Sequence, residues 1–296
     1  MKKYINFFIR LSVTALLILY LFKKIEITQV LNIFVLINPL VFLSASLLYI
    51  LSSYISTLRW KIFLNEKELK ISTLFSLYLI GSFFNNALPG IIGGDVVKIF
   101  MIKEKTGIRE AIASVFMDRY TGLFALLLIS LVFFILFYNK LPKHIFLWLV
   151  PISFSGFIVG TLFLMVISRV KMLRELKDYI STFTQKQILK GIFYSLLVQF
   201  IVIISVYIIF YGLNISISFF ELCVFLPIII LISMLPISIS GLGVREWCFI
   251  LFFGNSFGES QVVAVSFLWF LSQAFASVIG GIEYLRFKKP LNIKKE

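Results

Sequence analysis

The stretch Asn85–Phe100 reads NNALPGIIGGDVVKIF, and the rest of the chain is organised around it. Pro89 and three glycines break an apolar run that is otherwise suited to a membrane, and the chain resumes at Asp95 with a lysine at Lys98. Backbone N–H and C=O groups that leave a helix within hydrocarbon need new partners, so irregular backbone survives there only against protein or a water-filled cavity. The stretch therefore predicts a functional site inside a membrane protein.

Composition places the chain among polytopic membrane proteins. Its 296 residues are 60% hydrophobic and 14% charged, and the mean hydropathy is +1.02, whereas about a quarter of the residues in a water-soluble domain are charged. The net charge of +14 comes from 28 basic residues that lie almost entirely between the apolar runs, mostly on one face of the predicted topology. This asymmetry follows the positive-inside rule. It predicts a cell (inner) membrane protein with both termini in the cytoplasm and no nucleic-acid partner.

Six apolar runs are long enough to cross a bilayer, which takes about 20 residues in a helix. The first has the charge pattern of a signal peptide but no small-residue cleavage site, so we expect it to remain as a span. The second is followed by Arg59, Trp60 and Lys61, and an aromatic residue beside two cations is typical of an interfacial anchor. The predicted spans are Tyr4–Phe22, Pro39–Leu58, Tyr120–Tyr138, Ile145–Ile167, Ile192–Gly212 and Val262–Tyr284.

The segment Ser72–Lys103 is expected to enter and leave the membrane on one face. Lys67 and Lys70 precede it and Lys105 follows it, so both of its flanks are basic. A segment with positive charge on both sides is expected to return to the cytoplasm rather than to cross. We therefore expect two half-helices joined at Pro89–Gly94.

A second break occurs at Leu235–Phe249, LPISISGLGVREWCF. One ungapped register pairs the two breaks, proline with proline, glycine with glycine and cation with cation: Pro89 with Pro236, Gly94 with Gly241 and Lys98 with Arg245. Gly243 is a second glycine in the Leu235–Phe249 break. Three predicted spans separate the breaks, so one copy would be upside down relative to the other, the sequence signature of an inverted-repeat transporter fold. A chance match of residues common in membrane helices is the alternative.

These patterns predict an all-α polytopic fold of about six spans plus two broken or re-entrant helix pairs. No polar stretch is long enough for a separate soluble domain, which needs 50 residues or more. We expect one transmembrane domain, 1–296, with repeats near 1–140 and 141–296.

Asp95 follows two glycines at a predicted helix start, and two interpretations remain open. A carboxylate at this position can cap free N–H groups and interact with the positive end of the helix dipole. Alternatively, Gly93 and Gly94 let backbone donors approach a bound anion, and Lys98, one turn further on, faces the same pocket. The second interpretation makes these residues a substrate-binding site.

Two further charged pairs are candidate site residues. Asp118 and Arg119 fall at the predicted cytoplasmic end of a span, where Arg119 either snorkels to the headgroups or turns inward to pair with Asp95 or a lipid phosphate. Arg245 and Glu246 follow the second break with apolar sequence on both sides, and an ionisable residue within a membrane marks a functional site by default. Glu246 is expected to pair with Arg245 or with Arg119. Interhelical hydrogen bonds are expected of four hydroxyl residues, Ser52, Ser53, Ser56 and Thr57.

The sequence shows no enzyme constellation, cofactor motif or metal site. His144 is the only histidine, which excludes histidine-based metal sites and a Ser-His-Asp triad. Walker, GxSxG and HExxH motifs do not occur. Cys223 and Cys248 lie in apolar runs without a CxxC pair, and we expect them to be buried core thiols.

Four motifs in order resemble those of the flippase-like transmembrane domain of lysylphosphatidylglycerol synthases and their standalone relatives: NNALPGIIGGDVVKIF, DRYTGL at Asp118–Leu123, LPISISGLGVREW from Leu235 and GGIEYL from Gly280. The resemblance implies an inner-membrane protein related to the module that moves an aminoacylated phospholipid between leaflets, with a link to lipid metabolism and antibiotic resistance. Members that transfer lysine carry a further soluble domain, which is not expected here because the chain ends at Glu296. Other relatives are linked to polyprenyl-phosphate sugars.

The resemblance also implies which positions form the site. Lys98 stands where an arginine is usual, which keeps the charge but loses the bidentate fork. The matched positions are Asn85, Asn86, Pro89, Gly93, Gly94, Asp95, Asp118, Arg119, Gly241, Gly243, Arg245 and Glu246.

Three functions remain open at this stage. The first is translocation or binding of an anionic or aminoacylated membrane phospholipid. The second is a membrane subunit or enzyme of lipid modification, through phosphatidylglycerol lysyl transfer or polyprenyl-phosphate sugar transfer. The third is a scaffold for a soluble partner that docks on the basic loop 169–190.

Overall fold

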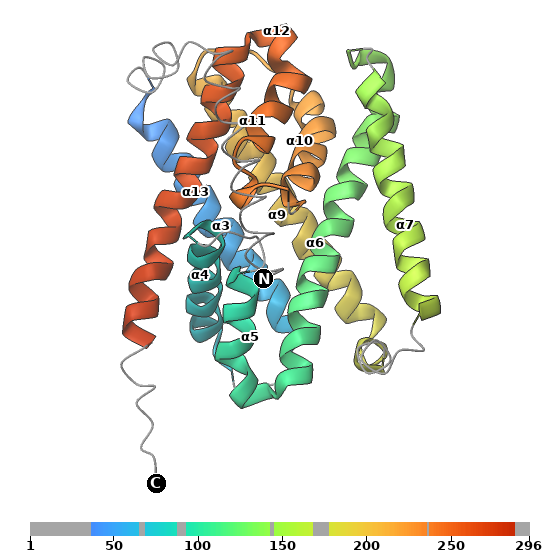
Figure 1. Cartoon of the computed structure of the whole chain (residues 1–296), viewed down its shortest axis with the longest axis vertical. Coiled ribbons are helices and arrows are strands. Elements are labelled where there is room, and N and C mark those ends of the chain that lie inside the picture. The colour runs from blue at the N-terminus through green and yellow to red at the C-terminus, as the bar shows by residue number, and fades with distance from the viewer. Residues whose placement is uncertain are drawn as a thin grey trace, which may run out of the picture.

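The computed structural model describes residues 37–64, 69–87, 93–142, 145–167, 178–235 and 237–287. Within these ranges every regular element is a helix, which confirms the predicted all-α polytopic class (Figure 1). Several predictions fall on other residues: the span Tyr4–Phe22, the two prolines Pro89 and Pro236, His144, and the first half of the basic loop lie outside the described residues.

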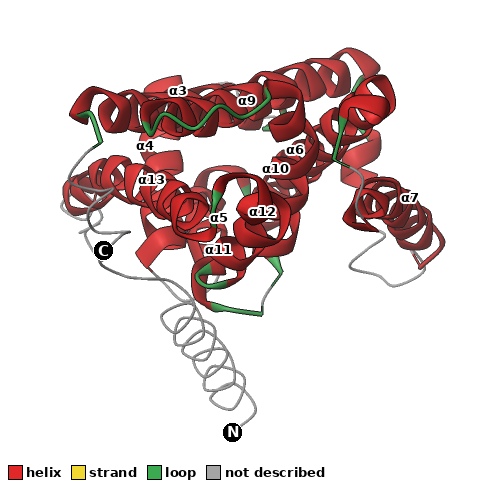
Figure 2. Ribbon diagram, turned by 90° about the horizontal axis from the view of Figure 1, so that it is seen from above, coloured by secondary structure: helices red, strands yellow, loops and turns green. Residues whose placement is uncertain are grey.

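Five helices in the described ranges are long and apolar enough to cross a membrane, and they confirm the five spans predicted there. Their bounds are α3 (Pro39–Ile62), α6 (Ile108–Phe137), α7 (Leu149–Ile167), α9 (Gln185–Gly212) and α13 (Glu259–Phe287). Viewed from above, α3 and α9 lie side by side, whereas α7 stands apart at one edge (Figure 2). The outward face of α7 carries exposed apolar side chains such as Ile152 and Val159, as expected of a helix that faces lipid.

Local sequence sets where several helices begin. Pro39 occupies the first turn of α3, where its missing N–H is not needed, and the Asn38 side chain accepts a hydrogen bond from the backbone N–H of Leu40 at 2.9 Å. Thr184 and Gln187 form a reciprocal capping box at the start of α9.

The span predicted to begin at Tyr120 begins much earlier, because α6 starts at Ile108 directly after Gly107. Gly107 has φ +81°, a conformation that glycine adopts without steric cost. It turns the chain sharply from α5 (Gly93–Thr106) into α6. The helix α6 has 30 residues and is therefore about 45 Å long. Asp118 consequently lies well inside a helix and not at the cytoplasmic end of a span. The predicted start at Tyr120 was wrong because two polar residues ahead of it, Ser114 and Asp118, are fully buried against protein.

Two regions built of short helices lie in opposite halves of the molecule (Figure 1). The first consists of α4 (Ile71–Ala87) and α5 (Gly93–Thr106), and the second of α10 (Phe219–Met234), a 3₁₀ turn η3 (Ile239–Gly241), α11 (Val244–Phe249), a π-helical turn η4 (Ile250–Gly254) and α12 (Asn255–Phe257). With 17, 14 and 16 residues, α4, α5 and α10 are each shorter than the about 20 that a span requires. Both pairs therefore match the predicted half-helices.

The two breaks meet inside the protein. The hydroxyl of Ser240 donates to the backbone carbonyl oxygen of Asn85 across 3.4 Å, although the two residues are 155 positions apart in the sequence. The local backbone conformations nevertheless differ at positions that the ungapped register pairs. Gly94 lies within α5, whereas its predicted counterpart Gly241 has φ +74° in a turn, and α11 begins only at Val244. The matching letters thus do not occupy matching backbone positions.

Candidate functional site

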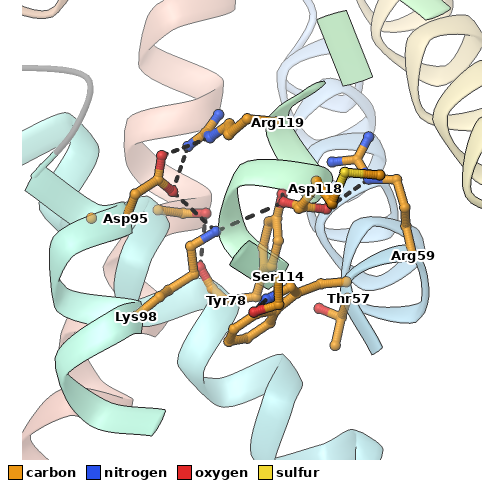
Figure 3. Close-up of polar contacts among 12 residues, drawn as sticks. Thr57, Arg59, Tyr78, Asp95, Lys98, Ser114, Asp118 and Arg119 are labelled. Atoms are coloured by element: carbon orange, nitrogen blue, oxygen red, sulfur yellow. Dashed lines mark hydrogen bonds and ion pairs between the residues drawn. The ribbon is translucent and has the colours of Figure 1, made fainter. Parts of the chain in front are cut away.

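A chain of five charged side chains runs through the interior between α3, α5 and α6 (Figure 3). Asp118 on α6 is 0% exposed, and its Oδ1 accepts a hydrogen bond from Nε of Arg59 on α3 at 2.7 Å. The Nζ of Lys98 on α5 lies 3.9 Å from Oδ2 of the same carboxylate. A buried carboxylate between two cations is favourable only because its desolvation is offset by this geometry.

Asp95 continues the chain on the other side of Lys98. Its two oxygens accept hydrogen bonds from Nε and Nη2 of Arg119, at 2.7 and 2.9 Å, and Oδ1 lies 3.0 Å from Nζ of Lys98. Of the two arrangements expected for Arg119, the structure has the inward one. The order is Arg59, Asp118, Lys98, Asp95, Arg119, so three cations face two carboxylates and one positive charge is left over.

The prediction that Arg59 and Trp60 anchor α3 at the membrane interface is wrong. Arg59 is 4% exposed, and its Nη1 donates to the Ser195 hydroxyl on α9 at 3.1 Å. Gly122 leaves room for it, because a Cβ there would lie 3.0 Å from Nη1. Trp60 is fully buried and donates from Nε1 to the Ser114 hydroxyl at 3.2 Å. Both side chains face protein because α6 and α9 cover this end of α3.

Tyr78 and Trp60 complete the surroundings of Lys98. The lysine Nζ lies 4.4 Å from the centre of the Tyr78 ring and 5.3 Å from that of Trp60, distances at which a desolvated cation gains from the ring faces. The Tyr78 hydroxyl also donates to Asp118 Oδ2 at 3.4 Å. Lys98 is therefore held between the carboxylates of Asp95 and Asp118 and beside two aromatic rings.

A polar cavity of about 160 Å³ opens beside this chain. Hydroxyl groups form most of its wall, and two cations, Lys98 and Arg119, reach it; none of the described lining residues is a carboxylate. Lys98 thus lines a cavity, whereas Gly93 and Gly94, expected at the same pocket, are not among its described lining residues; the binding role of all three stays a prediction. The lining residues are Tyr49, Ser52, Ser53, Ser56, Tyr78, Gly81, Ser82, Asn85, Lys98 and Arg119.

The serines of α3 do not form the interhelical hydrogen bonds that we expected of them. Ser52 and Ser53 both donate to the backbone carbonyl of Tyr49 in their own helix, at 2.8 and 2.9 Å, and Thr57 likewise donates to Ser53. Tyr49, which the sequence analysis missed, lines the cavity with Ser52, Ser53 and Ser56. Spacings of three, four and seven residues place these four positions on one face of a helix, and this stripe was the signal that would have found them.

Close backbone packing brings α5 to the cavity. A Cβ on Gly94 would overlap the carbonyl oxygen of Gly81 on α4, so the two helices touch at their backbones. The Gly94 N–H is already bonded to the Asn85 side-chain oxygen at 2.8 Å. In this structure the missing side chain of Gly94 serves helix packing and Asn85 caps α5, while the role of Gly94 as an anion donor stays a prediction. Gly93 is the first residue of that helix.

The second break places Arg245 and Glu246 together. Glu246 accepts hydrogen bonds from the Gly243 N–H at 2.6 Å, from the Ser266 hydroxyl at 2.9 Å and from Arg245 Nε at 3.3 Å. Of the two partners expected for Glu246, the structure selects Arg245. Neither residue is among the described residues that line the cavity.

Positive φ angles mark the turn ahead of that pair. Gly241 and Gly243 have φ of +74° and +81°, and Ser240, with φ +51°, adopts a left-handed conformation that is uncommon for a residue with a side chain. Such conformations cost energy and persist where the surroundings hold them. The second break is thus a defined turn.

Of the residues predicted from sequence, the structure brings Asn85, Asp95, Lys98, Asp118 and Arg119 into one region. Asn86 lies beside it on α4 with its side-chain Nδ2 buried and unbonded. No group of three His, Cys, Asp or Glu residues that suits a metal occurs in the described part of the chain. The thiols of Cys223 and Cys248 are buried and unpaired, as expected.

Comparison with known proteins agrees with this architecture. The model of the lysylphosphatidylglycerol synthase TM region matches residues 7–281. A UPF0104 membrane protein of Pyrococcus horikoshii is 24% identical in an alignment that covers 98% of this chain and 99% of that protein. The broken helices, the long spans and this match along nearly the whole chain lead to one conclusion: the chain is an integral membrane protein that belongs to the lysylphosphatidylglycerol synthase TM region family.

Proposed function

We propose that the protein binds the phosphate-bearing headgroup of an anionic or aminoacylated phospholipid in the cavity and translocates the lipid between leaflets. The supporting observation is the separation of charge at the cavity wall. Lys98 and Arg119 line the cavity, whereas Asp95 and Asp118 pair with Lys98 and are not among the described lining residues. A wall with two cations and no described carboxylate favours an anion over a cation.

The positive charge left over among the five buried side chains matches a ligand with one negative charge. Three cations and two carboxylates leave one positive charge in a region where water screens poorly. A phosphodiester carries one negative charge and accepts a bidentate hydrogen bond from arginine as a carboxylate does. It can therefore replace Asp95 on the guanidinium of Arg119, whose side chain is 36% exposed. The hydroxyl groups of the wall suit the polar remainder of a headgroup.

The arrangement of the breaks supports translocation beyond simple binding. Transporters with inverted repeats place their substrate where broken helices from opposite sides meet, and the two halves rock around it. Here the two breaks touch at Ser240 and Asn85, and Asn85 also lines the cavity. A headgroup bound there can change leaflets while its acyl chains stay in the bilayer.

Lipid exchange in vesicles tests this proposal. The full chain is reconstituted with fluorescent phosphatidylglycerol or its lysyl derivative, and a membrane-impermeant quencher measures movement between leaflets. We expect faster exchange than in protein-free vesicles. Loss of a hydrogen bond to a charged group, at about 1.5–3 kcal/mol, should weaken headgroup binding by the R119Q variant roughly tenfold or more.

Matched variants and lipid analysis separate the competing functions. R286Q changes an arginine whose side chain is 73% exposed and pairs only with Glu283 in the described contacts, so it should exchange lipid normally. Equal exchange with and without protein would contradict translocation. Mass spectrometry of lipids from cells with and without the protein gives a second readout, since a lipid-modifying enzyme changes which lipids exist and a translocase changes only where they reside.

A further inference from the structure

Arg245 has an unused hydrogen-bond donor in the protein interior. The residue is 7% exposed, and its Nη2 is buried without a hydrogen-bond partner. Across the described ranges only two other buried side-chain atoms share this state, Asn86 Nδ2 and Ser238 Oγ, and all three belong to the two breaks. Buried polar groups are almost always bonded, so each exception calls for a physical reason.

Glu246 does not supply the missing acceptor. Its Oε2 accepts from the Gly243 N–H, and its Oε1 is shared between Ser266 and the Nε of Arg245. The contact with Arg245 is a single one at 3.3 Å, made by the inner nitrogen of the guanidinium. The carboxylate thus offsets the charge but leaves Nη2 of the fork without an acceptor. An unbonded charged donor is costlier to bury than a neutral one.

Two aromatic rings pack beside this guanidinium. The Cζ of Arg245 lies 5.4 Å from the centre of the Trp269 ring and 5.0 Å from that of Phe270, both on α13. Arginine is attracted to ring faces at such distances. With Nε bonded to Glu246 and two rings beside it, the guanidinium has little freedom to turn Nη2 toward another acceptor in the protein.

We propose that Arg245, with the unpaired hydroxyl of Ser238 in the same break, forms a second binding site for a phosphate oxyanion, separate from the cavity at Arg119. Planar guanidinium groups bind phosphate oxygens well because the fork matches their spacing. The position of this site rests on Arg245 itself, whereas a phospholipid as the source of the phosphate rests on the proposed function.

One hydrogen bond connects the segments that carry the two sites. Ser240 lies between Ser238 and Arg245 in the second break, and its hydroxyl bonds to Asn85, which lines the cavity. A headgroup that leaves Arg119 therefore has a second arginine on the neighbouring segment. This arrangement provides two successive positions for one phosphate along a path between the breaks.

Native mass spectrometry of the full chain in detergent with phosphatidylglycerol tests the second site. The wild type should bind two lipids, R245Q should lose one of them, and R119Q should lose the other. R245K keeps the charge without the fork and S238A keeps the arginine, so both should weaken the second lipid about tenfold or less while folding normally. R286Q is the control and should bind two. Thermal unfolding monitors the fold of every variant.

The outcomes separate this proposal from the proposed function. Two lipids on folded R245Q, R245K and S238A alike would overturn the second site and indicate that only water satisfies Nη2. Loss of a lipid in R245Q but not in R119Q would support the second site while contradicting the cavity as a headgroup site. Inorganic phosphate distinguishes the sources: displacement of the Arg245-dependent lipid by millimolar phosphate assigns the site to free phosphate, and resistance to it assigns the site to the lipid.

Discussion

Replacing Asp118 with asparagine should destabilise the protein strongly, because it leaves Arg59 buried without its counter-charge. Asp118 is 0% exposed and Arg59 is 4% exposed, and 2.7 Å separates the bonded atoms. The net charge of the five side chains would rise from +1 to +2, and the acceptors left to Arg59, the amide oxygen of the new asparagine and the Ser195 hydroxyl, would both be neutral. Removal of one partner from a buried ion pair costs about 3–5 kcal/mol, which is our expected loss.

A second substitution tests whether that loss comes from the unpaired charge. In the double variant R59M/D118N the remaining charges are those of Lys98, Asp95 and Arg119, so the net charge returns to +1. Methionine fills much of the space of the arginine stem without a charge. We expect the double variant to recover at least half of the stability that D118N loses, because buried ion pairs are often replaced by apolar residues at little cost.

The measurement is the free energy of unfolding in mixed micelles, by denaturant titration followed through tryptophan fluorescence. E283Q is the matched control, since it removes a carboxylate from an ion pair at the end of α13 whose arginine is 73% exposed; it should change stability by about 1 kcal/mol or less. A D118N variant as stable as E283Q would refute the reasoning. So would a double variant that loses the sum of the two single losses, because the two residues would then act independently.

Three further predictions follow from packing, cavity volume and burial. G94A should lose about 1–3 kcal/mol of stability, since its Cβ would overlap the α4 backbone, whereas G156A on α7 meets nothing within 4 Å and should be neutral or slightly stabilising in the same titration. S56L should fill part of the cavity and slow lipid exchange in vesicles while the protein stays folded; an unchanged exchange rate would place the lipid path elsewhere. Cys223 and Cys248 are buried, so a maleimide should label neither until the protein is denatured; rapid labelling of the folded protein would show that the core is open.

The site could be predicted only in part, and Lys98 and Arg59 show why. Lys98 was found because it lies one helical turn from Asp95, so local spacing alone places both on one face. Arg59 was misassigned because an aromatic residue between two cations after an apolar run is the usual pattern of a membrane interface. Its true partners, Asp118 and Ser195, are 59 and 136 residues away in the sequence. Nothing near Arg59 in the sequence identifies them.

The sequence by itself determined the five spans that the described residues contain, apart from the start of α6, and the places of the two breaks. Both follow from rules that act over neighbouring residues: a span must be apolar for the thickness of the hydrocarbon, and proline and glycine interrupt the hydrogen bonds of the helix that contains them. The tertiary structure alone decided which charges meet, where the cavity opens and that Ser240 touches Asn85. The physical reason is that a buried charge is stable only beside a partner, and that partner is supplied by whichever helix packs against it.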